Sequence, residues 1–501
     1  MLDTTCPTSV SSGNDCDSII SIKLAVQSGS SPAPPAPNPP PPTAGGVHVG
    51  TGGPPRLVHA NERNVSALGM AHFAQTLYTF PGGQLFTNFQ TTCDVCVPHR
   101  IWEGRSFSSV DNGTTWTEIL PIANGAHVWK TCIPGDDPSW NSLSCYAYPL
   151  AIADPSNNRT GNLLMSRFEV DSTEGVRQVS VVNSTIDWPA PGLIPFADSI
   201  APGNWFMVAD GVPLTTNAKG IWLMALYGEL PEPLLPANTT HQNLNESSAV
   251  LVLVKNTDAS LTSWEYFSTV NTGQPWECAA SRGTYWPLSP HNLCNPTESA
   301  MVRLADGKIL VIWRNDPGYN VTLMAQTSDN DGQTWTLAAP MHGKITDGDF
   351  EDVVDAPFGV EPKLQMMGSG VLVLSTGRPR MYVWALAAGA DPLTATWQSY
   401  DLGKLHNAAI AAAGLGTLVP PFPADFWEIW RGASDPSLRG TGCCTDAYTG
   451  LAPISSTELV ITYDMLARSC PAGVPHSPSL GCDLIVSMVL NVTAVSGGGG
   501  R

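Results

Sequence analysis

Residues 298–335 read ESAMVRLADGKILVIWRNDPGYNVTLMAQTSDNDGQTW, and their pattern recurs along the chain. It contains a turn at Asp306-Gly307, an apolar run from Ile309 to Trp313, a second apolar run, and a polar turn that ends at Trp335. The runs are short, rich in Ile, Val and Leu, and bounded by Gly, Asp and Asn, with no apolar spacing of three to four residues. They therefore predict buried strands of a sheet.

The same arrangement recurs along the chain, because a turn, an apolar strand and then a lone Trp follow one another repeatedly. The strands begin after Gly83, Gly161, Gly220, Gly307 and Gly370, and a last one begins after Thr457. The tryptophans that follow the first five are Trp116, Trp188, Trp264, Trp335 and Trp397, which are 62 to 76 residues apart. This period suits a four-stranded blade, so the sequence predicts an all-β protein with a six-bladed β-propeller.

Two of the polar turns share a specific pattern, S-x-D-x-G-x-T-W. Residues 109–116 (SVDNGTTW) match it completely, and residues 328–335 (SDNDGQTW) match it with Asn330 in place of Asp. The side-chain oxygen at the third position can accept N–H groups of its own turn, Gly supplies a positive φ, and Trp packs beneath the blade. Such a turn is first of all a folding device, so it does not by itself indicate a function.

Composition excludes some classes of partner. The chain has 501 residues and a net charge of −19 at neutral pH, which argues against a nucleic-acid partner because phosphate would be repelled. No apolar run reaches membrane-spanning length, so membrane insertion is not expected.

Cysteines and glycosylation sequons indicate the secretory pathway. The chain has 12 cysteines, among which Cys132/Cys145, Cys278/Cys294 and Cys470/Cys482 are plausible local disulfides. Asn-x-Ser/Thr sequons occur at Asn64, Asn112, Asn158, Asn183, Asn238, Asn245, Asn320 and Asn491. The pair Cys93 and Cys96 has no second CxxC with which to form a zinc site, so a redox or zinc role is disfavoured.

The ends of the chain predict a modular organisation. Residues 1–27 contain Cys6-Pro7 and Cys16-Asp17 in an order that matches residues 465–492, which indicates the tail of a preceding module of the same type or, alternatively, a stray strand of chance similarity. Residues 28–46 are a Pro-rich linker. The propeller is expected over residues 47–495, and residues 496–501 begin a Gly-rich linker. The start lacks the features of a signal peptide, so we interpret the chain as a fragment of a secreted tandem-repeat protein.

Candidate functional residues are those at the ends of the predicted inner strands. Arg314 ends the strand KILVIW, Arg378 follows VLVLST, and Tyr448 precedes the last inner strand. Glu298 precedes the fourth repeat's strands and Asp94 follows the first. A pair of arginines at one axis suits a carboxylate ligand, which the guanidinium fork binds through two hydrogen bonds.

These residues resemble the motifs of the sialidase (neuraminidase) superfamily, weakly over 57–492 and more specifically at a few segments. Glu298 to Arg314 is similar to the family's glutamate, turn, strand and second carboxylate-binding arginine. The segment STGRPRMYVW resembles the setting of the third arginine, with Arg378 preferred and Arg380 as the alternative. Residues 446–451 (DAYTGL) resemble the segment of the tyrosine nucleophile, and Asp94 lies where the family has its acid/base aspartate.

The resemblance implies a retaining exo-glycosidase that removes terminal sialic acid or a related acidic sugar from a glycan, without a cofactor or a metal. Because the substrate's carboxylate would repel an anionic nucleophile, these enzymes use Tyr. Tyr448 would attack while Glu298 takes its proton, and Asp94 would protonate the leaving oxygen. The competing interpretation is a non-catalytic propeller module that binds glycans or serves in the extracellular matrix.

One departure from the family concerns the first arginine, which sialidases carry in an Arg-Ile-Pro motif. The corresponding residues here are MAHFAQTLYTFPGG, without arginine, and Arg63, Arg100, Arg105 and Arg167 are substitutes outside the motif. Losing one such contact costs a few kcal/mol, roughly, so the sialic acid substrate is less firmly predicted than the fold. Simpler alternatives stay open for the other positions: Tyr448 as a packed channel aromatic, Arg314 and Arg378 as ion-paired strand ends, and Asp94 as a turn residue. The acidic run 347–355 is a solvated loop or, less favourably, a calcium site.

Overall fold

The computed structural model describes 18 segments of the chain. These are residues 46–62, 73–91, 104–123, 125–135, 141–147, 151–152, 160–171, 175–187, 206–213, 220–230, 248–271, 296–315, 322–345, 356–377, 381–414, 419–422, 448–468 and 482–495. They form 27 strands and one helix. The expected module tail at 1–27, nearly all of the Pro-rich linker and residues 496–501 lie outside this description, so these domain boundaries stay predictions.

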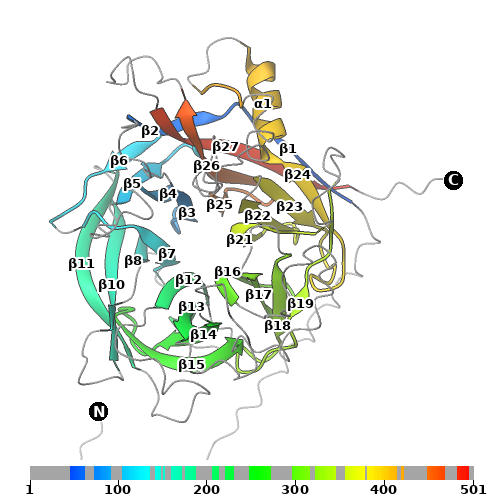
Figure 1. Ribbon diagram of the computed structural model, residues 1–501. Helices are drawn as coiled ribbons and strands as arrows, with labels where there is room; N and C mark the ends of the chain where they lie inside the picture. Colours follow the sequence, from blue (N-terminus) through cyan, green and yellow to red (C-terminus); the bar gives the residue numbers. More distant parts are fainter. Residues whose placement is uncertain are drawn as a thin grey trace, which may run out of the picture. The chain divides into compact units, whose positions relative to one another are not determined.

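The strands form five hydrogen-bonded sheets set around one axis, which is the arrangement of a β-propeller (Figure 1). The first sheet contains β3 (Phe73–Thr79), β4 (Leu85–Gln90), β5 (Gly104–Ser109) and β6 (Thr117–Ile119). The nine-stranded sheet begins with β12 (Phe206–Pro213), β13 (Trp222–Leu230), β14 (Ser248–Asn256) and β15 (Ser263–Asn271). It continues with β11 (Gly175–Asp187), β10 (Thr160–Asp171), β8 (Ser142–Ala147) and β7 (Trp129–Pro134), and the short β9 (Ala151–Ile152) pairs with β10.

Two further sheets follow in the chain. One contains β16 (Pro296–Arg303), β17 (Ile309–Asn315), β18 (Met324–Ser328) and β19 (Ala339–Pro340). The other contains β21 (Val360–Met366), β22 (Leu372–Gly377), β23 (Tyr382–Leu386), β24 (Trp397–Asp401) and the short β20 (Gly343–Lys344). Within each sheet the long strands pair with their sequence neighbours in antiparallel fashion, as the repeated turns predict.

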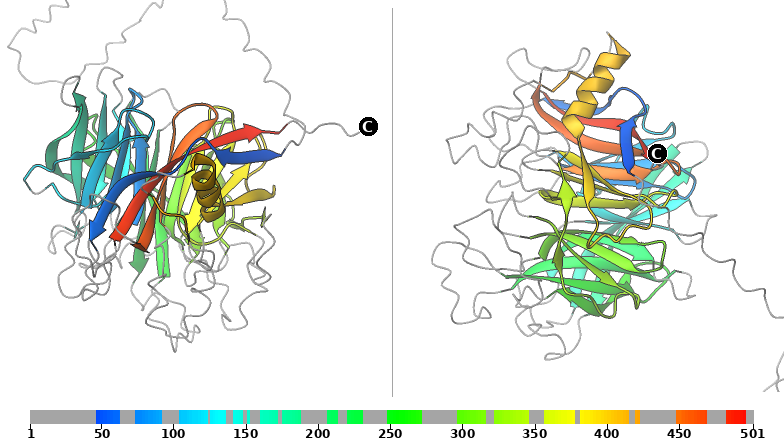
Figure 2. Two further views of the ribbon diagram at one scale, coloured as in Figure 1. Left: turned by 90° about the horizontal axis from the view of Figure 1, so that it is seen from above. Right: turned by 90° about the vertical axis from the view of Figure 1, so that its right-hand side faces the viewer.

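The last sheet joins the two ends of the propeller. It contains β25 (Thr449–Pro453), β26 (Glu458–Arg468) and β27 (Cys482–Ala494), and both β1 (Val47–Thr51) and β2 (Arg56–Glu62) pair with β27. Figure 2 shows these N-terminal strands, in blue, beside the red C-terminal strand. The ring is thus closed by hydrogen bonds between residues more than 400 positions apart, such as the one that the N–H of Gly52 donates to the carbonyl of Val489 at 2.8 Å.

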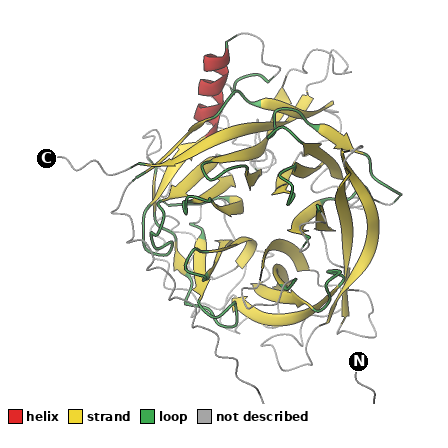
Figure 3. Cartoon of the chain, turned by 180° about the vertical axis from the view of Figure 1, so that it is seen from behind, coloured by secondary structure: helices red, strands yellow, loops and turns green. Residues whose placement is uncertain are grey.

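Strands β3, β7, β12, β16, β21 and β25 are the innermost strands, and each contacts the next around the axis (Figure 1). Seen from behind, the strands surround the same axis and the only helix of the described segments lies at the rim (Figure 3). Because the innermost strands of all the sheets lie around one axis, residues that are far apart in the sequence come together there.

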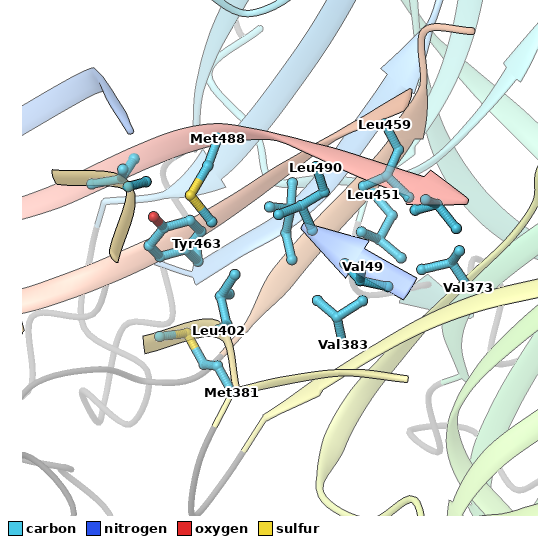
Figure 4. Close-up of a cluster of buried hydrophobic side chains, with 14 of the residues drawn as sticks. Val49, Val373, Met381, Val383, Leu402, Leu451, Leu459, Tyr463, Met488 and Leu490 are labelled. Atoms are coloured by element: carbon cyan, nitrogen blue, oxygen red, sulfur yellow. The ribbon is translucent and has the colours of Figure 1, made fainter. Parts of the chain in front are cut away.

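The apolar core lies between neighbouring sheets. Figure 4 shows one cluster, in which Val373 and Val383 of one sheet face Leu451, Leu459 and other residues of the next. A second cluster, which includes Trp313 and Met324, joins β17 and β18 to β13 and β14. Each sheet therefore buries both faces only because its neighbours cover them, which is why the strand sequences are nearly continuously apolar.

The turns at 109–116 and 328–335 have the same hydrogen-bond pattern. Asp111 accepts the N–H of Thr115 through Oδ1 at 2.8 Å, and Asn330 accepts the N–H of Thr334 at 2.9 Å. Hydrogen bonds from Thr115 and Ser109 outweigh the effect of burial and lower the pKa of Asp111. Each turn also contacts the neighbouring sheet, since Ser487 donates to the carbonyl of Gly113 and Ser268 donates to that of Gly332.

A third turn has this geometry although its sequence departs from the pattern. In residues 256–264, Asp258 accepts the N–H groups of Thr262 and Ser263, and the Trp264 indole donates to the carbonyl of Leu261. Leu261 occupies the position of the glycine and has a positive φ of 59°. The sequence pattern missed this turn because one residue is inserted between Asp and Trp and the glycine is absent.

Helix α1 (Leu402–Ala413) was not predicted from the sequence and is a local departure from the all-β class. Asp401 caps its N-terminus by accepting the N–H of Lys404 at 3.0 Å, and Gly414 ends it with a positive φ of 74°. His406, on its buried face, hydrogen-bonds the Tyr463 hydroxyl at 2.6 Å. The helix thereby fastens to β26 at the rim.

One predicted disulfide is confirmed. Cys132 and Cys145 lie opposite each other in β7 and β8 and form a bond with a sequence separation of 13 residues. The proposed pairs Cys278/Cys294 and Cys470/Cys482 involve residues outside the described segments, as do Cys93 and Cys96. No helix in the segments that the structure describes has both the length and the apolar character needed to cross a membrane.

Candidate active site

Three of the predicted site residues meet at the axis. Tyr448 immediately precedes β25, Glu298 lies near the start of β16, and Arg314 lies near the end of β17. The Tyr448 hydroxyl donates to Oε1 of Glu298 at 3.2 Å, and Nη1 of Arg314 donates to Oε2 of Glu298 at 3.2 Å. The two oxygens of one carboxylate are thus directed toward different partners from different sheets.

The Glu298 carboxylate receives one further hydrogen bond, from the backbone of β21. The N–H of Glu361 donates to Oε2 of Glu298 at 2.9 Å. Glu298 itself is buried, with 9% of its surface exposed. Since Oε2 accepts from Arg314 and from Glu361, the carboxylate is fixed in orientation and Oε1 remains on Tyr448.

Electrostatics keep Glu298 ionised. Burial alone would raise its pKa, but the charges of Arg314 and then Lys130, together with the hydrogen bonds from Glu361 and Arg314, lower it from 4.5 to about 2. At neutral pH the group is therefore a carboxylate, and it can accept a proton from Tyr448 only as the phenol loses it to a bond-forming step.

A second carboxylate lies beside the first. Oε1 of Glu361 is paired with Nζ of Lys130 at 2.5 Å and with Nζ of Lys363 at 3.1 Å. Its Oε2 is buried and has no hydrogen-bond partner within the described part of the chain. Burial lowers the pKa of Lys130, and the charge of Glu361 acts in the opposite direction. The axis therefore holds two carboxylates and three cationic side chains in the described segments.

The residues at the axis share a backbone feature. The pairing of an innermost strand with its neighbour shifts register at Glu298 in β16, at Glu361 in β21 and at Lys130 in β7. Comparable shifts occur in β3, between Phe73 and Thr76, and in β12, between Val208 and Gly211. A bulge re-aims a side chain that regular alternation would place on a sheet face, and here it directs charged groups to the axis.

Three other predicted site residues, Asp94, Arg378 and Arg380, lie outside the described segments, so their roles stay predictions. Among the substitutes for the first arginine, Arg105 pairs with Glu118 and His59, and Arg167 pairs with Glu169. Both arginines lie on strands two positions outward from the innermost strand of their sheet.

Sequence reasoning missed Lys130, Glu361 and Lys363. A signal was present, because each is a charged residue at the beginning of an otherwise apolar strand, in HVWKTCIP and FGVEPKLQM. Groups of three or more His, Cys, Asp or Glu side chains placed to hold a metal do not occur in the described residues, and the acidic run 347–355 lies outside them.

The sequence matches no family model and no curated protein. The structure is similar to that of a protein of unknown function from Dyadobacter fermentans, with 12% identity, a TM-score of 0.50, and coverage of 89% of this chain and 99% of the other. It is also similar to a Hadza microbial sialidase, with 12% identity, coverage of 88% and 68%, and a TM-score of 0.46. An α-L-arabinanase from Penicillium chrysogenum, complexed with arabinobiose, is similar at 11% identity, with coverage of 86% and 97% and a TM-score of 0.44.

At 12% identity, the similarity to the Dyadobacter fermentans protein concerns the fold alone and leaves the chemistry to the residues at the axis.

Proposed function

We propose that this sialidase-like propeller is a retaining exo-glycosidase that acts on sialosides or a related acidic sugar. The observation that carries the proposal is the hydrogen bond of 3.2 Å between the Tyr448 hydroxyl and Oε1 of Glu298. A nucleophile and its base must lie within hydrogen-bond reach of each other, and a third group must orient the base. Arg314 is that third group, because it binds the other oxygen of Glu298.

In the proposed reaction the Tyr448 oxygen attacks the anomeric carbon while its proton moves to Glu298, and the bond to the leaving sugar oxygen breaks. Asp94 is proposed to protonate that oxygen and later to activate the water that releases the sugar from Tyr448. A neutral phenol suits this role because the substrate carries a carboxylate on the reacting carbon, which would repel an anionic nucleophile. The low pKa of Glu298 means that it takes the proton only in the course of this step.

An acidic substrate is favoured by the cations at the axis. Arg314 lies beside Glu298, and we propose that it contacts the substrate carboxylate together with Arg378 or, alternatively, Arg380. Lys130 and Lys363, with 8% or less of either side chain exposed, pair with Glu361, so that carboxylate does not offset the charge of Arg314.

The finer architecture is also part of this proposal. We propose six blades, with the nine-stranded sheet counted as two blades that the parallel pairing of β11 and β15 joins. We assign the turns at 109–116 and 328–335 as Asp boxes. The disulfide between Cys132 and Cys145 and the sequons support an extracellular glycoprotein.

Hydrolysis of a fluorogenic α-sialoside tests the proposal. The Tyr448→Phe variant removes the nucleophile and is expected to lose activity by roughly 10³-fold or more. The matched control is Tyr146→Phe, because the Tyr146 hydroxyl donates to the carbonyl of Leu261 at 2.7 Å within another buried cluster. It should cost about 1 kcal/mol of stability and leave turnover within a few fold.

Two results would overturn the proposal. One is full activity of the Tyr448→Phe variant. The other is a wild-type protein that binds sialylated glycans but turns over neither the sialoside nor other acidic glycosides, which is the result expected of a non-catalytic glycan-binding module.

A further inference from the structure

A buried ionic network connects β7 to β21 across the inner ring. Nζ of Lys130, in β7, lies 2.5 Å from Oε1 of Glu361, in β21, and Nζ of Lys363 lies 3.1 Å from the same oxygen. The exposed fractions of the three side chains are 3%, 2% and 8%. Burying charged groups costs free energy even when they are paired, so packing alone does not explain why this network is present.

The backbone conformation of Glu361 indicates what the network stabilises. Its φ is 45°, in the left-handed region that residues other than Gly, Asn and Asp seldom adopt. Such a conformation costs on the order of 1–3 kcal/mol and persists where surrounding contacts determine it. The same residue lies in the register shift between Val360 and Lys363, and its N–H group donates to Oε2 of Glu298.

We propose that Lys130 is a positioning residue for the Glu298–Tyr448 pair. By pairing with the Glu361 carboxylate from the opposite strand, Lys130 holds the left-handed bulge so that the N–H of Glu361 stays on Oε2 of Glu298. Oε1 then remains available to Tyr448. The inference rests on the proposed function for its catalytic consequence, but the geometry that it describes exists with or without turnover.

Lys363 provides an internal comparison. It contacts the same oxygen of Glu361 as Lys130 does, but it is only two residues away on the same strand. The pair of Lys363 and Glu361 therefore neutralises charge within β21, whereas the pair of Lys130 and Glu361 joins β21 to β7. If positioning comes from the connection across the axis, loss of Lys130 must have a larger effect than loss of Lys363.

Because charged groups surround Glu298, replacing Lys130 should change the pH dependence of kcat/KM. Among the described residues, Glu298 is faced by Arg314 from β17, Lys130 from β7, the N–H of Glu361 in β21 and Tyr448 ahead of β25, and Lys363 lies beside it on the Glu361 carboxylate. Lys130 is one of the cations that lower the pKa of Glu298. Its removal raises that pKa, so the acid limb of the pH profile of kcat/KM moves to higher pH.

The experiment compares Lys130→Met, Lys130→Arg and Lys363→Met in the full chain. Lys130→Met keeps most of the side-chain length and removes the charge, and we expect kcat to fall about tenfold or more, KM to change less than threefold, and the acid limb to rise by roughly one pH unit. Lys130→Arg restores the charge and should recover most of kcat, and Lys363→Met should lower kcat less than Lys130→Met does.

A second measurement does not depend on turnover. Carbon-13 NMR of protein labelled at the Glu carboxyl carbons follows the titration of Glu298, whose signal is identified by its absence in the Glu298→Gln variant. In Lys130→Met the midpoint should rise, and a crystal structure should show a longer distance between the N–H of Glu361 and Oε2 of Glu298. These two readouts succeed or fail regardless of whether the protein hydrolyses any sugar.

Two results would overturn the positioning role. One is an unchanged distance between the N–H of Glu361 and Oε2 of Glu298 in Lys130→Met. The other is an equal loss of kcat in Lys363→Met and Lys130→Met, because the network would then act only by charge. Absence of hydrolysis by the wild-type protein, with the expected longer distance in Lys130→Met, would instead refute the proposed function and leave the positioning inference standing.

Discussion

Replacing Glu298 by Gln should make the stability of the protein less dependent on pH in the acid range. In the folded protein the pKa of Glu298 is about 2, against an ordinary value of 4.5. Because the folded value is the lower one, the ionised group contributes stability that is present above about pH 4.5 and is lost as the pH falls toward 2. The difference of about 2.5 pH units corresponds to roughly 3 kcal/mol at 25 °C.

The assay is the melting temperature of the wild type and of Glu298→Gln between pH 7 and pH 2. The gap between the two should be widest above pH 5 and should narrow, by an amount equivalent to most of those roughly 3 kcal/mol, as the pH approaches 2. Glu265→Gln is the matched control, because Glu265 forms a 2.8 Å ion pair with Lys255 while 47% of its side chain is exposed. Such a pair contributes less than about 1 kcal/mol. A gap for Glu298→Gln that stays constant from pH 5 to pH 2 would refute the electrostatic account of the site.

Two further predictions concern the framework. Replacing Cys132 and Cys145 together by Ser should destabilise the protein by about 3 kcal/mol, because the disulfide joins residues 13 positions apart and so restricts the unfolded chain. Equal urea midpoints of the oxidised wild type and the variant would contradict this. Gly332→Ala should lower the melting temperature more than Gly307→Ala. Both glycines have a positive φ, but a Cβ at Gly332 would lie 2.9 Å from Cδ1 of Leu253, whereas one at Gly307 would have no atom within 4 Å. Equal losses in the two variants would show that backbone strain alone determines the cost.

Much of the framework could be predicted from the sequence because it is local. Runs such as KILVIW become the buried strand β17, and turns such as SVDNGTTW carry their own hydrogen-bond acceptor, so both signals lie within a few residues. The turn at 256–264 was missed because Leu261 adopts a positive φ without being Gly, and a tertiary contact, the hydrogen bond from the Tyr146 hydroxyl to its carbonyl, holds it there. Helix α1 lies outside the repeated pattern of turn, strand and Trp, so that pattern did not predict it although Asp401 and Gly414 are ordinary start and stop signals.

The candidate site also contains residues that the sequence could predict and residues that it could not. Glu298, Arg314 and Tyr448 could be proposed from their resemblance to a family, whose motifs preserve spacing along the chain. Lys130 and Glu361 could not, since their importance depends on which strands become neighbours in the ring and on shifts in strand register. Alternation along a strand predicts which face a side chain occupies, and a bulge alters that alternation at the position where function needs it.

The bulges also explain why the ionisable groups collect at one end of the axis. Lys130, Glu298 and Glu361 each lie within the first three residues of an innermost strand, and Tyr448 lies immediately before another. The hydrogen bonds and ion pairs among them require these strand beginnings to lie together. A sheet interior of regular strands would bury such charges between apolar faces at great cost, whereas a bulge at the end of a strand turns them toward one another. The apolar parts of the same strands can then pack between sheets without interruption, so the requirements of the core and of the site are met by different residues of each strand.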